Sequence, residues 1–214
     1  MGAHGARGRT AVVVKPRAAI SWSGGKDCCT ALLRTYRDYD VVAMITMLGG
    51  LIGRADRAEA LAARLEKGLE EIRAQASQLS RRPRVYFEEW DDPLISGIQW
   101  VEELIEIAGG DPIFPELRHA KLAKDRVVQP DEVVRRHPDV IVASWCGKAV
   151  RKEKIASRVG WDSLPAVQAN HIYEIKSAFI LQPGPASLTD GVRQLHEVIM
   201  AEPSRSIVAS RLLM

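Results

Sequence analysis

From residue 82 to residue 200 the sequence alternates between short apolar runs and longer amphipathic stretches. The runs RVYFEEW, DVIVASW and HIYEI are short and rich in β-branched or aromatic residues, which is typical of buried strands. The stretches between and after them are typical of helices; the first of these, ISGIQWVEELIEIAGG, ends at Gly109-Gly110, a left-handed stop. The alternation predicts an α/β fold with a mostly parallel sheet and helices on both faces.

A long amphipathic segment precedes this region. Between residues 55 and 80 the apolar residues Leu61, Leu65, Leu69 and Ile72 follow each other at steps of four, four and three, so they form one stripe of a helix. Such a helix would be about 39 Å long, more than one compact layer requires. We expect either a surface helix packed on the sheet or a rod that joins two bodies.

Composition and charge exclude several function classes. The 214 residues are 46% hydrophobic and 27% charged, with a net charge of +3, which is ordinary for a globular protein and a weak basis for binding nucleic acid. No apolar stretch approaches the ~20 residues of a membrane-spanning helix. The first 20 residues lack the apolar core of about 7–15 residues that a secretory signal needs, which predicts a cytoplasmic chain. The histidines show no paired metal-binding spacing, so we assign no metal.

Four successive segments resemble one family. The segments are PRVYFEEWDDPLISGIQWVEELIEIAGG, DEVVRRHPDVIVASWCGK, GWDSLPAVQANHIYEI and ILQPGPASLTDGVRQLHEVI. They are similar to the C-terminal lobe of cobalamin-binding and iron–siderophore-binding proteins of ABC transporters, and LGGLIGRADRAEALAARLEKGLEEIRA resembles the helix that links the two lobes in that family. The resemblance implies a substrate-binding protein that takes a corrinoid or a similar chelate, needs no cofactor and works with a transporter permease.

In that family the ligand lies between two lobes, and in open α/β sheets the loops at the carboxyl ends of the strands face the ligand. An aromatic lining with a few polar groups suits a flat corrin ring. Trp90 and Trp145 could equally be buried anchors, and an isolated cysteine such as Cys146 is more often buried than ligand-facing. The candidate ligand-binding residues are therefore Trp90, Asp91, Trp145, Cys146, Lys148 and Gln182.

Two other sets of residues have structural explanations. We expect Trp100 and Trp161, on or beside helical segments, to belong to the core. Asp131 and Glu132 could dock a membrane partner, but carboxylates at a helix start also stabilise the helix dipole, and we favour that role.

A different motif stands near the N-terminus. A strand at 18–23, the turn SGGKD, a helix at 28–39 and an apolar strand at 40–47 would form one βαβ unit. This unit resembles the start of PP-loop ATP pyrophosphatases of the diphthine–ammonia ligase type, in which successive backbone N–H groups cradle a phosphate. The alternative function is therefore an ATP- and Mg²⁺-dependent ligase. Its candidate nucleotide-binding residues are Ser23, Gly24, Gly25, Lys26 and Asp27.

Taken together, the segments predict five regions: a leader (1–17), a PP-loop-like βαβ fragment (18–46), an interlobe-type helix (47–81), a substrate-binding lobe (82–200) and a tail (201–214). The region before the long helix is too short for a second lobe of the binding-protein type and for a whole nucleotide domain. We therefore expect an incomplete binding module, formed by the fusion of two truncated frames, rather than a complete enzyme.

Overall fold

The computed structural model describes residues 44–182 and 184–211. Contacts divide the chain into two compact units, Met1–Ala62 and Ala63–Met214. Within the described residues no helix combines the length and the apolar character needed to cross a membrane. The candidate residues Ser23 to Asp27 and most of the expected βαβ unit lie outside the described residues.

In the first unit the structure describes the helix α2 (Met44–Leu51) and the start of α3 (Ala55–Ala76). The backbone N–H of Arg54 donates to the carbonyl of Gly49 at 2.6 Å, and a Cβ on Gly49 would lie 2.1 Å from that of Ala58. The expectation of a strand through residue 47 is therefore wrong for its last part, which is helical. Met44, Met47 and Leu48 are good helix formers, and propensity in a short apolar run does not settle its state.

The second unit is built on a mixed sheet. Its main strands are β1 (Arg84–Asp91), β4 (Val140–Ala143) and β5 (Ile172–Glu174), which pair in parallel in that order. Two short strands share the outer side of β1: β2 (Leu94–Ser96) runs antiparallel near its end, and β3 (Asp111–Pro112) runs parallel near its start. The α/β sheet, mostly parallel, is confirmed.

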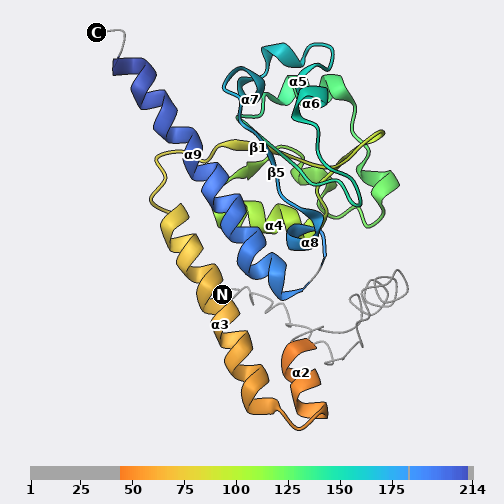
Figure 1. Ribbon diagram of the computed structural model, residues 1–214, viewed down its shortest axis with the longest axis vertical. Coiled ribbons are helices and arrows are strands. Elements are labelled where there is room, and N and C mark those ends of the chain that lie inside the picture. Colours follow the sequence, from red (N-terminus) through yellow and green to blue (C-terminus); the bar gives the residue numbers. More distant parts are fainter. Residues whose placement is uncertain (1–43, 183, 212–214) are drawn as a thin grey trace, which may run out of the picture. The chain divides into compact units, whose positions relative to one another are not determined.

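Helices cover both faces of this sheet (Figure 1). One face is covered by α4 (Gln99–Ala108), α8 (Ser177–Ile180) and α9 (Val192–Arg211), which pack on a core that includes Val85 and Phe87 of β1. The other face is covered by α5 (Pro130–Arg136), α6 (Lys152–Ala156) and α7 (Pro165–Gln168), on a core that includes Tyr86 of β1. Short turns of helix complete the unit: η1 (Pro115–Leu117), η2 (Ala123–Arg126), η3 (Trp161–Ser163) and η4 (Ser187–Gly191).

The two faces follow from the alternation of side chains along β1. Val85 and Phe87 point to one core and Tyr86 to the other, as the period of two in a strand requires. The second half of α3 packs on the same core as α4 and α9 through Leu69 and Ile72, so the predicted apolar stripe is used there. Trp161 is fully buried and Trp100 is partly buried, as expected for core residues.

The end of α4 agrees with the prediction, but its start does not. Gly109 ends this helix in the left-handed conformation with a φ of 101°, as the sequence predicts. The helix begins at Gln99, however, because the chain first turns at Asp92-Pro93 and returns as β2. The peptide bond between Asp92 and Pro93 is cis. This hairpin places Asp91 and Asp92 at a sharp corner at the carboxyl end of β1.

Candidate ligand-binding site

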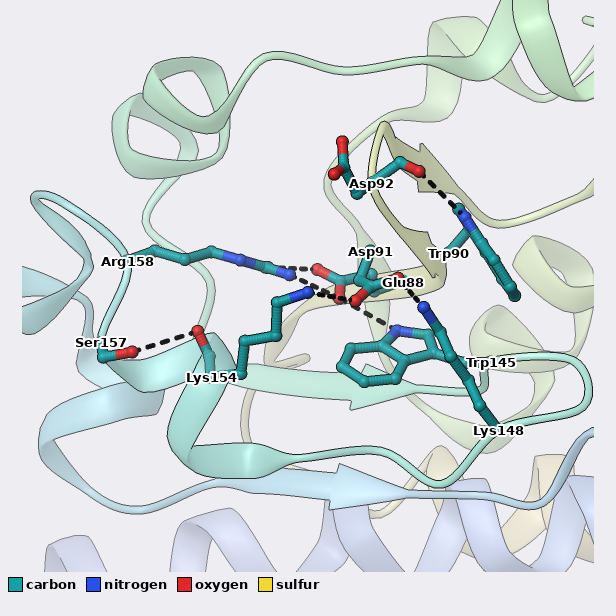
Figure 2. A network of polar contacts seen from close by, with 9 residues as sticks. All are labelled: Glu88, Trp90, Asp91, Asp92, Trp145, Lys148, Lys154, Ser157 and Arg158. Atoms are coloured by element: carbon teal, nitrogen blue, oxygen red, sulfur yellow. Dashed lines mark hydrogen bonds and ion pairs between the residues drawn. The ribbon is translucent and has the colours of Figure 1, made fainter.

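The candidate site lies where β1 and β4 end, and a polar network connects the two strands (Figure 2). β1 supplies Glu88, Trp90 and Asp91. The segment after β4 supplies Trp145 and Lys148, and α6 with the residues that follow it supplies Lys154 and Arg158. Because parallel strands end at the same edge of a sheet, residues 57 to 70 positions apart in the sequence meet here.

Glu88 is the buried centre of the network. Its carboxylate accepts two hydrogen bonds from the guanidinium of Arg158, at 2.5 and 2.9 Å, and a third from the indole N–H of Trp145 at 3.1 Å. The residue has no exposed surface. Burial raises the pKa of Glu88 above its ordinary value, although Arg158 and Trp145 act in the opposite direction. The Arg158 bond is bidentate, which fixes both side chains in one orientation.

Asp91 forms the second carboxylate centre, closer to the surface. One of its oxygens accepts a bond from Lys148, and the other accepts one from Lys154 at 2.7 Å. Burial opposes ionisation of this carboxyl, but the two lysines outweigh it and lower the pKa of Asp91 below its ordinary value. Only 2% of the Asp91 side chain is exposed, compared with 40% for Lys148 and 47% for Lys154. The anion is therefore covered and the two cations face solvent.

Two tryptophans flank these cations. The Lys148 ammonium lies 4.0 Å from the ring centroid of Trp90 and 5.0 Å from that of Trp145. Trp90 is partly exposed and its indole N–H donates to the carbonyl of Asp92 at 3.0 Å. Trp145 is almost fully buried and belongs to the core on the α5–α7 face. Trp90 is therefore the more accessible of the two rings.

A surface pocket of about 450 Å³ borders the network. Its walls are the corner at residues 91–94, the segment 127–130 and the pair Arg158 and Val159. Val159 is almost completely exposed and forms part of the apolar wall. The pocket therefore joins a charged side, at Asp91 and Arg158, to an apolar side.

The candidate residues predicted from the sequence fall into three groups. Trp90, Asp91, Trp145 and Lys148 are brought together in the network. Cys146 is exposed beside it, contrary to the expectation that an isolated cysteine is buried. Gln182 follows α8, whose Ile180 belongs to the core on the opposite face of the sheet, and among the described contacts none joins Gln182 to the other candidates.

Three residues of the network were not predicted. Lys154 and Arg158 lie four positions apart at and after α6, so a helix that follows a buried strand presents them on one side. Glu88 sits on the same side of β1 as Tyr86, where the alternation requires a core residue. A carboxylate at such a position near a strand end signals a paired charge, and this signal was available in RVYFEEW.

Among the described residues, those of the site included, no group of three or more His, Cys, Asp or Glu side chains is arranged to bind a metal ion. The groups that the site offers to a ligand are two ammonium groups, indole rings and a short apolar wall. This arrangement suits a ligand that has a flat surface and polar substituents.

Comparison with known proteins agrees with this architecture. The family model described as periplasmic binding protein matches residues 24–179. An ABC transporter substrate-binding lipoprotein of Bacillus subtilis (strain 168), the uncharacterized YvrC, is 28% identical over 170 residues, which are 75% of this chain and 50% of the relative. The chain thus spans about half the length of this relative.

Two solved structures have the same fold. The periplasmic heme-binding protein RhuT from Roseiflexus sp. RS-1 superposes with a TM-score of 0.60 at 20% identity, over 82% of this chain and 73% of that one. The periplasmic vitamin B12 binding protein BtuF of Vibrio cholerae gives 0.56 at 20% identity, over 81% and 69%.

The family match begins at Gly24, so it also covers most of the segment in which the sequence resembles a PP-loop protein. The comparisons give no support to that second resemblance or to a fusion. Since the match covers well over half of the 214 residues, the chain belongs to the periplasmic binding protein family.

Proposed function

We propose that this chain is the ligand-binding component of an ABC uptake system and that it binds a large, flat metal chelate of the corrinoid type. The observation that carries the proposal is the placement of Trp90 and Trp145 beside Lys148 at the carboxyl ends of β1 and β4. In open α/β sheets this edge is where ligands bind. The partly exposed indole of Trp90 offers a rigid apolar surface to a macrocycle.

The relatives narrow the choice of ligand. Similar solved structures include binding proteins for vitamin B12 and heme and a protein of an Fe³⁺-hydroxamate transport system. All of these ligands are metal chelates too large for one small pocket, and the 450 Å³ pocket offers one wall of a larger site. We propose that residues 82–200 form one lobe and that the ligand is held against it.

Two further parts of the proposal follow from the family. A binding protein of an ABC system delivers its ligand to a permease, which is the partner we propose. We also propose that the protein is located outside the cytoplasmic membrane, because the family is described as periplasmic and the relative as a lipoprotein. This location replaces the cytoplasmic one expected from the first 20 residues.

The test is a titration of the purified chain with cyanocobalamin, followed by its visible spectrum and by tryptophan fluorescence. We expect saturable binding that Trp90→Leu weakens about tenfold, because loss of one stacking surface costs on the order of 1–2 kcal/mol. Trp100→Leu is the matched control, since the indole of Trp100 donates to the Ile180 carbonyl on the opposite face of the sheet. Equal losses in both variants, or no saturable binding by the wild type, would refute the corrinoid proposal.

A further inference from the structure

The charges around Asp91 do not cancel. Its single carboxylate is shared by two ammonium groups, those of Lys148 and Lys154. The neighbouring carboxylate, Glu88, is already paired with the guanidinium of Arg158. The group of five side chains therefore carries one positive charge more than its carboxylates neutralise.

The excess charge is on the accessible side. Nearly half of each lysine side chain is exposed, whereas Asp91 is covered. Each ammonium has three N–H donors, and the described bonds to Asp91 use one on each lysine. A group that approaches the two lysines from solvent thus meets free donors before it meets the carboxylate of Asp91. The exposed carboxylate of Asp92 lies at the same corner but forms no ion pair with them among the described contacts.

The two ammonium groups are also fixed in position. Both ammonium groups are hydrogen-bonded to the carboxylate of Asp91, and Asp91 lies at the corner where β1 turns into β2. Lys148 lies over the rings of Trp90 and Trp145, which limits its movement further. A fixed pair of donors loses little conformational entropy when it binds a third group.

We propose that the ligand carries an anionic oxygen group, such as a carboxylate, that binds Lys148 and Lys154 while its flat part lies on Trp90. This inference rests on the proposed function, because it concerns the substituents of the same ligand. The inference distinguishes two classes of chelate, those with ionised side groups and those with neutral amide side groups. The aromatic surface alone would bind both classes equally well.

A matched pair of corrinoids tests the inference. Dicyanocobyrinic acid and dicyanocobinamide share the corrin ring, but the first has carboxylate side groups and the second has mainly amides. We expect the acid to bind the wild type about tenfold more tightly at low ionic strength, and we expect this ratio to shrink as salt screens the lysines.

Substitutions locate the effect. Lys148→Gln and Lys154→Gln should each lower the affinity for the acid about threefold more than they lower the affinity for the amide. Lys121→Gln is the control, because Lys121 is also exposed but lies outside this cluster. Unchanged melting temperatures would confirm that these surface variants fold.

The outcomes are distinct. If the acid and the amide bind with equal affinity, or if Lys121→Gln has the same effect as the two cluster variants, the anionic-group inference is wrong while the binding function stands. If neither corrinoid binds, the corrinoid proposal and this inference both fail.

Discussion

The guanidinium of Arg158 binds both carboxylate oxygens of Glu88, at 2.5 and 2.9 Å, in a part of the sheet where the carboxylate has no contact with solvent. A buried carboxylate that loses such a partner keeps its desolvation penalty and loses the compensating attraction. The pair therefore constrains the strand ends on which the ligand site is built.

Replacement of Arg158 by Met should destabilise the chain by about 3–5 kcal/mol in urea unfolding, because Glu88 is left buried without its cation. The double variant Glu88→Gln with Arg158→Met should recover part of this loss, since the charge is removed together with its partner. If the double variant were as unstable as the single one, packing of the Arg158 stem, and not its charge, would explain the loss.

Glu102 predicts a pH dependence of stability. This carboxyl of α4 is buried, its Oε2 has no hydrogen-bond partner among the described residues, and burial raises its pKa to about 8 although Arg118 and Arg126 oppose the shift. An unfolded Glu loses its proton near pH 4.3, so the folded state retains more protons between about pH 4.5 and 8. The free energy of unfolding should therefore fall by up to several kcal/mol as the pH rises through that window.

Glu102→Gln should flatten this dependence and be more stable than the wild type at pH 8. The measurement is the unfolding midpoint in urea at pH 5, 6.5 and 8. Glu103→Gln, an exposed neighbour on the same helix, should leave the slope unchanged. A slope that persisted in Glu102→Gln would have to come from other groups.

Gly109 offers a test of local geometry. A Cβ at this position would lie 2.7 Å from Leu79 Cδ1 and 3.0 Å from Ala76 Cβ, and the φ of +101° is unfavourable for any other residue. Gly109→Ala should therefore cost roughly 2 kcal/mol or more, from backbone strain and from crowding. Gly147 also has a positive φ, of +78°, but open space around it, so Gly147→Ala should cost only the backbone part, about 1 kcal/mol. Thermal unfolding of the two variants compares these costs directly. Equal losses would mean that crowding of the new Cβ against Ala76 and Leu79 adds no measurable cost at position 109.

The exposed thiol of Cys146 offers a test of where the proposed ligand binds. It immediately follows Trp145. In a variant with Cys28 and Cys29 replaced by Ser, saturating cyanocobalamin should slow the reaction of Cys146 with a thiol reagent by about tenfold or more, because the bound ring covers that segment. An unchanged rate in the presence of bound ligand would place the ligand elsewhere.

The fold was predictable from periodicity because β1, β4 and β5 each lie in a run of at least five residues rich in β-branched or aromatic side chains, RVYFEEW, DVIVASW and HIYEI, and helices separate these runs. The hairpin of β1 with β2 was not, since three residues of strand carry too little pattern and the turn is set by its contacts with β1. The helix at Met44–Leu51 was also missed, because an apolar run of this length suits either state.

The site was predictable only in part. The position of Trp90, Asp91, Trp145 and Lys148 after two successive parallel strands follows from the rule that such loops meet at one edge. The ion pair between Lys148 and Asp91 does not follow from this rule. The two residues lie 57 positions apart, and the path of the chain between them decides whether the ammonium reaches the carboxylate. Gln182 was grouped with them by the same rule, but no described contact joins it to the network.

The attachment of Lys148 and Lys154 to one strand-borne carboxylate also bears on how this protein can change over evolution. Cys146 and Gly147, which precede Lys148, are exposed, so substitutions there leave the core unchanged as long as the ammonium still reaches the corner after β1. The positions of the two charges would then stay constant while their surroundings diversify. New ligands of the same charge pattern could be accommodated by reshaping the loop alone.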